Sequence, residues 1–418
     1  MNFFQYKNNT LHIEELNIEA LAENNVTPFY CYSSSHIEDQ YDILKNSFDM
    51  DVKIFYAMKA NSNLSILKTL LNKGAGIDVV SGGEIKRSLN AGALGKNIIY
   101  SGIGKTDEEL KYAIESKVSC INIESENELI RLNEISKQKK ISTDIALRIN
   151  PDVDAKTHIK ITTGKSENKF GIEFDYARSI YQKASQLTNV NIKGISVHIG
   201  SQITSLKPFK KAFTILYDLI QQLRKDGHKI KHVDLGGGLG VPYTENESIP
   251  TYKEYANLIQ SIFGNTDLKV FLEPGRLLVA NSSLLITKVI DIKSTTQKTF
   301  IVVDAAMNDF IRPTLYGSYH EILPVRNNLG TSNKLYDVVG PICETGDYFA
   351  KNRKMTSVDI GSLIAIKSVG AYGMVQSSNY NSRAQSAEIL VKNDLHETIR
   401  DRQEVENLYE KERSASWL

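Results

Sequence analysis

Eight apolar segments rich in β-branched residues recur along the first two thirds of the chain, and they constrain the fold more than any other feature. Most of them are separated by a stretch with helical spacing, such as Asp107–Ser116. Near-continuous apolar strands that alternate with helices are typical of a parallel sheet covered on both faces. Eight such units predict an α/β fold, a (β/α)8 TIM barrel. The segments are 52–61, 76–81, 97–102, 120–125, 144–150, 192–200, 232–240 and 269–276.

Polar residues and glycines gather where these segments end. Barrel enzymes place their chemistry at the carboxyl ends of the strands, because the loops there converge on one mouth. An open doubly wound sheet has the same local pattern, but it does not need a polar group at so many successive strand ends. The barrel is therefore favoured. The residues are Lys59, Asp78, His198, Gly236–Gly238, Glu273 and Arg276.

After Arg276 the pattern changes to strands without helices of comparable length between them. This predicts a C-terminal antiparallel β domain. Short β-like segments at 3–8 and 27–33 could join that domain or cap the barrel. We expect residues 31–279 to form the barrel and residues 1–30 and 280–418 to form the β domain. Two further predictions are a mobile lid at 151–174, a long polar segment at the mouth, and a helical surface tail at 393–418.

Charge and composition exclude several classes of partner. Lysine and arginine number 50 against 49 acidic residues, so nothing favours binding to nucleic acid or to an anionic membrane. No apolar run is long enough to span a bilayer, and the N-terminus does not resemble a signal peptide. The three cysteines are far apart and odd in number, which fits a reducing cytoplasm. We therefore expect a cytoplasmic protein that acts on a small molecule.

Lys59 lies at the end of the first strand segment, in YAMKAN. Burial there disfavours the charged form, which lowers the pKa of the lysine and makes its amine nucleophilic. Such a lysine can form a Schiff base with an aldehyde cofactor. A lysine at a barrel rim can also simply extend its charge into water, so the residue alone leaves both interpretations open.

Three other strand ends carry groups that suit a flat, phosphorylated cofactor. The run Gly236–Gly238 allows backbone N–H groups to approach a phosphate, with a following helix start adding a favourable dipole, although such a run is often only a turn. A buried Glu273 needs a partner, either a pyridinium nitrogen or Arg276. His198 could stack on a cofactor ring or be structural. Together with Lys59 these residues predict a cofactor site at one end of one barrel.

The motifs YAMKAN (56–61), HIGSQ (198–202), DLGGGLG (234–240) and EPGR (273–276) resemble those of the fold type III pyridoxal-phosphate decarboxylases. That family has an alanine-racemase-like barrel and a β domain, and the resemblance covers essentially the whole chain. Within the family, RPTLYGSYHEI (312–322), GPICETGDY (340–348) and GAYGM (370–374) look like diaminopimelate decarboxylase.

The resemblance implies a role for each matching residue. Lys59 would carry pyridoxal 5'-phosphate and Cys343 would donate a proton, so both would be catalytic. The implied cofactor-binding residues are Lys59, Asp78, His198, Ser201, Gly237, Gly238, Glu273, Pro274, Gly275, Arg276 and Tyr372. The implied substrate-binding residues are Arg276, Arg312, Tyr316, Glu344 and Tyr372. Cys343 and Glu344 would reach the site from the second subunit of a homodimer, and no metal is implied.

The implied reaction is decarboxylation of meso-2,6-diaminopimelate to L-lysine and CO2, the last step of bacterial lysine biosynthesis. Two arginines can grip carboxylates, and Glu344 can pair with the distant ammonium. This favours diaminopimelate over the substrates of sister decarboxylases, namely ornithine, arginine or carboxynorspermidine. A racemase of the same fold has an arginine at the ring nitrogen, where this chain has Glu273. A non-catalytic homologue would lack Lys59 or Cys343.

Overall fold

The computed structural model describes residues 3–155, 158, 160, 163–164, 167–327 and 334–418. The chain forms two compact units. The barrel unit consists of Glu38–Pro242 and Glu247–Leu278, and the β unit consists of the N-terminal residues up to Ile37, Tyr243–Asn246 and Val279–Leu418. The predicted lid at 151–174 includes residues 156–157, 159, 161–162 and 165–166, which lie outside the described residues.

The barrel unit contains a closed parallel barrel of eight strands, which confirms the predicted fold class. The pairing runs from β13 through β5 to β8, then through β9, β11 and β12 back to β13. Each of the eight predicted segments overlaps one strand, although β9 and β11 begin one and two residues before their segments. The strands are β5 (Val52–Ala57), β6 (Gly76–Val79), β7 (Ile98–Tyr100), β8 (Cys120–Ile123), β9 (Thr143–Asn150), β11 (Val190–Ser196), β12 (His232–Asp234) and β13 (Lys269–Leu272). The short β10 (Ile172–Glu173) pairs with β9 outside this ring.

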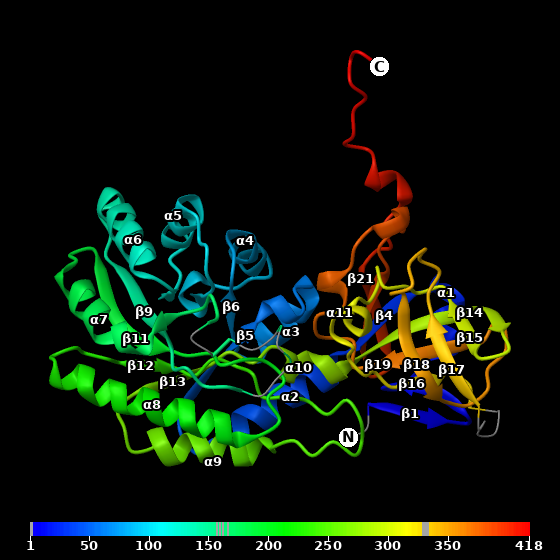
Figure 1. Ribbon diagram of the computed structural model, residues 1–418, viewed down its shortest axis with the longest axis horizontal. Helices are drawn as coiled ribbons and strands as arrows, with labels where there is room; N and C mark the ends of the chain where they lie inside the picture. Colours follow the sequence, from blue (N-terminus) through cyan, green and yellow to red (C-terminus); the bar gives the residue numbers. More distant parts are fainter. Residues whose placement is uncertain (1–2, 156–157, 159, 161–162, 165–166, 328–333) are drawn as a thin grey trace. The chain divides into compact units, whose positions relative to one another are not determined.

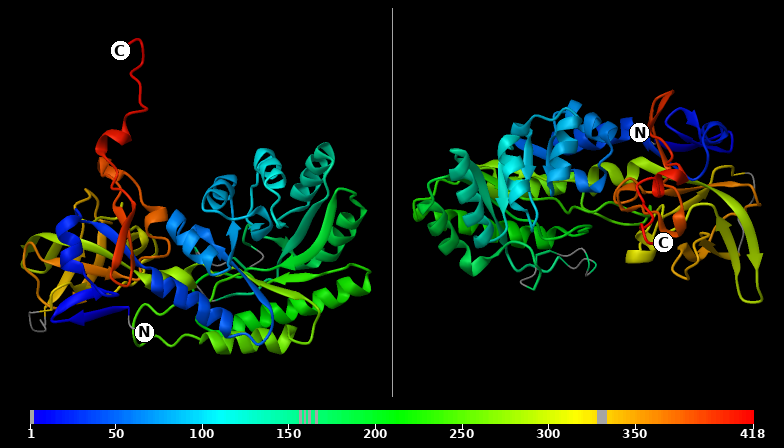
Figure 2. Two further views of the ribbon diagram at one scale, coloured as in Figure 1. Left: turned by 180° about the vertical axis from the view of Figure 1, so that it is seen from behind. Right: turned by 90° about the horizontal axis from the view of Figure 1, so that it is seen from above.

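Helices lie outside the barrel strands (Figures 1 and 2). They are α3 (Leu64–Asn72), α4 (Gly82–Asn90), α5 (Asp107–Glu115), α6 (Glu126–Lys139), α7 (Ala177–Gln186), α8 (Leu206–Lys225) and α9 (Tyr252–Phe263). Helices α5 and α8 show local reasons to form. Helix α5 begins with a capping box in which Thr106 and Glu109 satisfy each other's backbone N–H groups. Helix α8 buries Phe209, Phe213 and Leu216 at helical spacing, and each such side chain contributes roughly 2–3 kcal/mol of burial free energy.

The β unit is built around a long sheet. Its strand order is β18-β17-β15-β14-β4-β20-β21, and β19 pairs with β14 and with β16. The strands are β4 (Phe29–Ser33), β14 (Ser283–Ser294), β15 (Thr299–Val303), β16 (Ile322–Pro324), β17 (Leu335–Val339), β18 (Tyr348–Lys354), β19 (Leu363–Lys367), β20 (Ala387–Lys392) and β21 (Leu395–Arg400). Beside it lie β1 (Phe4–Lys7), β2 (Thr10–Ile13), β3 (Leu16–Asn17) and α1 (Ile18–Asn24).

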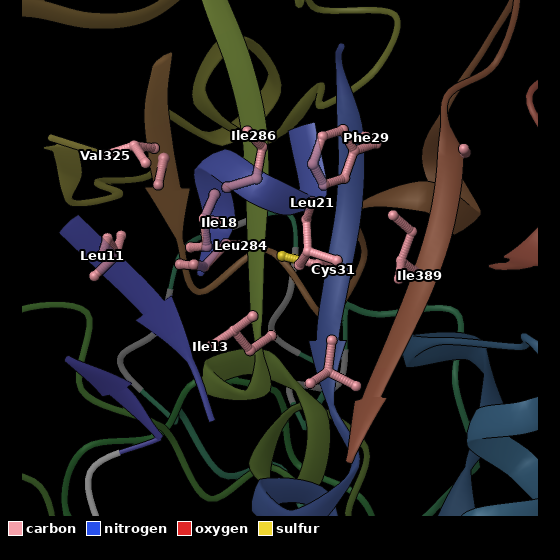
Figure 3. Packing of buried hydrophobic residues seen from close by; sticks show 13 residues of the cluster. Leu11, Ile13, Ile18, Leu21, Phe29, Cys31, Leu284, Ile286, Val325 and Ile389 are labelled. Carbon is pink, nitrogen blue, oxygen red and sulfur yellow. The ribbon is translucent and has the colours of Figure 1, made fainter. Parts of the chain in front are cut away.

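The N-terminal segments belong to this β unit. Strand β4 pairs with β14 and β20, so the segment 27–33 joins the β sheet instead of capping the barrel. Side chains from β2, α1, β4 and β14 share one buried apolar cluster, with Ile13, Phe29, Cys31 and Leu284 fully buried in it (Figure 3). Helix α2 (Ser34–Asn46) then leads from the β unit into the barrel unit.

The predicted helical tail at 393–418 is wrong. Residues Leu395–Arg400 form β21, which pairs antiparallel with β20, and beyond them the only helical segment is the short 3-10 helix Val405–Leu408. The reason is the two-residue turn Asn393-Asp394, where Asn393 takes a φ of 55°. Asparagine tolerates that conformation, which a tight hairpin turn requires. An ion pair between Arg400 and the buried Glu388 fixes the hairpin.

Among the described residues, none of the helices combines the length and the apolar character needed to cross a membrane.

Candidate active site

Lys59 and Asp78 form an ion pair at the carboxyl ends of β5 and β6. Lys59 lies in the 3-10 turn Met58–Ala60, and its Nζ is 3.1 Å from Asp78 Oδ2. The two residues meet because Ala57 pairs with Asp78 across the adjacent strands. The Asp78 side chain is 0% exposed and the Lys59 side chain is 38% exposed. Lys59 is thus half-buried and has a buried counter-ion, whereas the sequence left open whether it is desolvated or extends into water.

Glu273 and Asp234 form a pair of carboxyl groups at the ends of β13 and β12. Their carboxyl groups are hydrogen-bonded to each other, and both are buried. Burial and the neighbouring charges of Asp234 and Asp78 raise the pKa of Glu273 well above its ordinary value. Ser101 Oγ also donates to Glu273 Oε1 at 3.1 Å. The alternative partner of Glu273 considered from the sequence was Arg276, but the guanidinium of Arg276 contacts Ser201 instead.

His198 is held as a neutral ring beside the glycine run. The backbone N–H of Gly237 donates to His198 Nδ1 at 3.2 Å. Burial, with the positive charges of Arg148 and Lys59, lowers the pKa of His198 well below its ordinary value. A neutral imidazole that accepts at Nδ1 carries its proton on Nε2. His198 is therefore oriented by the same loop that the sequence predicted to bind a phosphate.

The loop after β12 allows another group to approach its backbone closely. Gly238 has a φ of +107°, and a Cβ built on it would lie 2.3 Å from the carbonyl oxygen of Gly200. Ser201 follows Gly200 in the chain, and its Oγ accepts from the guanidinium of Arg276 at 3.1 and 3.3 Å. No helix follows the run directly, because the next one, α9, begins at Tyr252. The prediction that a helix starting directly after this run adds a favourable dipole for a phosphate is therefore wrong.

In the β unit, Arg312 lies among three tyrosines. It begins α11 (Arg312–Tyr316), and its guanidinium carbon is 5.4 Å from the ring centre of Tyr316 and 5.9 Å from that of Tyr372. Its Nη2 donates to the hydroxyl of Tyr243 at 3.4 Å. Arg312 is buried, and Tyr372 holds a left-handed φ of 59°. Aromatic rings around a guanidinium restrict its orientation without neutralising its charge.

Cys343 and Glu344 lie on an exposed loop of the same unit. Thr314 of α11 donates to the carbonyl of Gly346 at 2.6 Å, which connects this loop to the helix that carries Arg312. The backbone N–H of Cys343 donates to Asn381 Oδ1 at 3.1 Å. Among the three cysteines, Cys31 and Cys120 are buried and only Cys343 is exposed. This exposure is expected of a thiol that acts on another molecule.

The structure thus gathers the predicted site residues within each unit. The barrel unit holds Lys59, Asp78, His198, Ser201, Gly237, Gly238, Glu273, Pro274, Gly275 and Arg276, and the β unit holds Arg312, Tyr316, Cys343, Glu344 and Tyr372. Sequence reasoning missed Asp234, Asn122, Ser101 and Gln202. The signal for Asp234 was a charged residue inside the apolar strand HVDL. The signal for Gln202, whose side-chain amide donates to and accepts from the backbone of Val241, was only its place in HIGSQ.

Comparison with known proteins first defines the class. The domain family described as "Pyridoxal-dependent decarboxylase, pyridoxal binding domain" matches residues 34–280, so this is a pyridoxal-dependent decarboxylase barrel. Diaminopimelate decarboxylase of Haemophilus influenzae is 43% identical over 411 residues, which cover 98% of this chain and 99% of that protein. The chain belongs to the diaminopimelate decarboxylase family, as its motifs predicted.

Solved structures of that family have the same fold. The Helicobacter pylori diaminopimelate decarboxylase complexed with L-lysine has a TM-score of 0.90 at 39% identity, covering 94% of this chain and 98% of that one. The diaminopimelate decarboxylase from M. jannaschii in co-complex with L-lysine has a TM-score of 0.94 at 34% identity, covering 100% and 99%.

Proposed function

We propose that this protein decarboxylates meso-2,6-diaminopimelate to L-lysine and CO2 with pyridoxal 5'-phosphate as cofactor. The observation that carries the proposal is the joint presence of the Lys59–Asp78 pair, a neutral His198 and a proton-holding Glu273 at one barrel mouth. The names of the full-length relatives support the choice of substrate.

The residues at the mouth fit the cofactor. Lys59 supplies an amine for an aldehyde carbon, and the glycine loop with Ser201 offers backbone and hydroxyl donors to a phosphate. A neutral His198 can lie against a flat ring without adding a charge to it. Glu273 meets a ring nitrogen as a hydrogen-bonding acid. When bound, the cofactor supplies an electron sink for the pair of electrons that remains on the substrate Cα after CO2 leaves.

The side chains of the β unit supply substrate binding and a proton. Arg312 can bind a carboxylate with its planar fork, and the surrounding tyrosines hold that fork in place. Glu344 can pair with an ammonium group at the far end of the substrate. Cys343 can give a proton to the substrate Cα, because its thiol is exposed and next to Glu344.

The reaction is tested by incubating the purified protein and pyridoxal phosphate with diaminopimelate, ornithine and arginine separately. Product amino acid and CO2 are measured in each case. We expect L-lysine and CO2 from the meso isomer of diaminopimelate, because only this substrate offers a second carboxylate to the two arginines. Turnover of ornithine or arginine without turnover of diaminopimelate would overturn the proposed substrate.

We also propose a homodimer with shared active sites, in which Cys343 and Glu344 act on the cofactor of the partner subunit. Two variants with strongly reduced activity test it, Lys59→Ala and Cys343→Ala. In a mixed dimer of the two, one site combines the intact Lys59 of one chain with the intact Cys343 of the other. With a shared site we expect remixing of equal amounts to restore about a quarter of wild-type activity. No restoration in verified mixed dimers means that each chain completes its own site.

A further inference from the structure

Four buried side chains form a closed ring of hydrogen bonds across the barrel interior. Asn122 Nδ2 donates to Ser101 Oγ at 3.0 Å and to Asp234 Oδ2 at 3.2 Å. Ser101 Oγ donates to Glu273 Oε1 at 3.1 Å, and the carboxyls of Glu273 and Asp234 complete the ring. All four residues are at most 9% exposed. Ser101 and Asn122 belong to the β7–β8 side of the barrel, and Asp234 and Glu273 to the β12–β13 side.

The charges around this ring do not balance without a proton. Among the described residues, no lysine or arginine forms an ion pair with Asp234 or Glu273, and Lys59, whose charge acts on Glu273, is paired with Asp78. Two buried carboxyl groups in hydrogen-bond contact cannot both be ionised, so they share one proton. The ring therefore stores a proton beside the place proposed for the cofactor.

The contacts decide which carboxyl carries the proton. Asp234 Oδ1 accepts the backbone N–H of Gly236 at 3.0 Å, and Oδ2 accepts from Asn122, so donors stabilise Asp234 as the anion. Glu273 accepts only from Ser101 among the described donors. The hydrogen bond between the two carboxyls raises the pKa of Glu273 and opposes the rise that burial gives to the pKa of Asp234. Glu273 is the acid and Asp234 is its anionic partner.

We propose that Asp234 is a positioning residue that acts through Glu273, keeping a proton available to the nitrogen of a heteroaromatic ring bound at the barrel mouth. This inference rests on the proposed function for the identity of the ring. Glu273 can transfer its proton to the ring nitrogen and keep a hydrogen bond to it. The protonated nitrogen is then a cation that lies beside the two carboxylates. Asp234 favours that state, since its negative charge stabilises any cation that Glu273 contacts. No other reactant is needed, because the proton only moves between Glu273 and the ring nitrogen.

The variant Asp234→Asn tests the proposal, because it removes the charge and keeps the shape. Its amide can still accept from Gly236, and the Oδ1 of Asn122, which has no hydrogen-bond partner among the described residues, can accept from the new amide. The first measurement uses the protein without cofactor. Infrared difference spectra against Glu273→Gln isolate the carbonyl band of a protonated Glu273. We expect that band to persist to higher pH in the wild type than in Asp234→Asn, because the substitution removes the contribution of Asp234 to the pKa of Glu273 and leaves that of burial.

The second measurement uses the holoenzyme with cofactor labelled with 15N in its ring. We expect the 15N shift of a protonated nitrogen in the wild type and a shift toward the unprotonated value in Asp234→Asn. The value of kcat should fall on the order of 10- to 100-fold, as for other residues that orient a catalytic group, with little change in KM. Asp309→Asn is the matched control, because Asp309 is an equally buried aspartate in the β unit. It should leave both signals unchanged.

An infrared band and a 15N shift in Asp234→Asn that equal those of the wild type would overturn the proposal. If the wild type binds no pyridoxal phosphate, the proposed function fails, while the infrared test of the proton pair stands by itself. If Asp234→Asn does not fold, Asn122→Ala replaces it. That variant removes one donor to the Asp234 anion, and it should change both signals in the same direction by a smaller amount. Unchanged signals in a folded Asn122→Ala would then overturn the proposal.

Discussion

The substitution Gly237→Ala tests the proposed cofactor cradle most directly. The φ of Gly237 is not in the left-handed region, so an alanine there is opposed by crowding and not by backbone strain. Its Cβ would lie 2.3 Å from the carbonyl oxygen of Glu273, and ordinary contact begins at 3.4 Å. The two backbones must therefore separate by about 1.1 Å, the difference between these distances. Forced separations of this kind in packed regions cost about 1–3 kcal/mol.

That separation disturbs contacts on both sides of the loop. Glu273 N donates to Gly236 O at 2.7 Å, and Gly237 N donates to His198 Nδ1 at 3.2 Å. Glu273 and His198 are the groups proposed to meet the cofactor ring. If the full cost falls on the bound state, the Kd for pyridoxal phosphate rises about 5- to 150-fold. If part of it falls on the cofactor-free protein, the melting temperature drops as well.

Titration of the cofactor-free protein with pyridoxal phosphate, followed by absorbance, measures the Kd. Thermal melting measures the part of the cost that destabilises the cofactor-free protein. Gly83→Ala is the matched control, because its Cβ would meet only Ser81 Oγ, at 3.7 Å, within helix α4. It should leave the Kd unchanged and raise stability by about 0.5–1 kcal/mol. Wild-type affinity together with wild-type stability in Gly237→Ala would refute the reasoning.

Three further outcomes are expected. Lys59→Ala should lose the cofactor absorbance that borohydride bleaches and nearly all turnover; substantial turnover would contradict the assigned role. Cys343→Ala should bind the cofactor normally but turn over slowly, and failure to bind would make the cysteine structural. Burial raises the pKa of Asp309 from 3.8 to about 6. The folded state then holds the proton of Asp309 more tightly than the unfolded chain does. The protonated Asp309 therefore contributes to the free energy of unfolding at acidic pH, and this contribution of roughly 3 kcal/mol is lost as pH rises from about 4 to about 6. Urea unfolding of the wild type and Asp309→Asn across this range should show the difference, and identical pH profiles would contradict it.

Local pattern explains why the barrel was predictable. A strand buried on both faces requires a continuous run of apolar side chains, and each of the eight runs overlaps a strand. Lys59, His198, Gly237 and Glu273 follow such runs, so their place at the mouth follows from the strand direction. Local pattern failed at the tail, where the charged segment after Asn393 suggested a surface helix. There the pairing partner is β20, and a strand on the edge of a sheet can be as polar as an exposed helix.

By itself, the sequence determined the order of strands, the class of fold and the family, because apolar runs and short motifs are properties of neighbouring residues. Only the tertiary structure decided how charges are balanced at the site. Lys59 gains a counter-ion from the next strand, and Glu273 gains a proton partner in Asp234 and a donor in Ser101, 172 residues away. Protonation depends on burial and on distances between groups, and these exist only after the barrel has closed and brought the strand ends together.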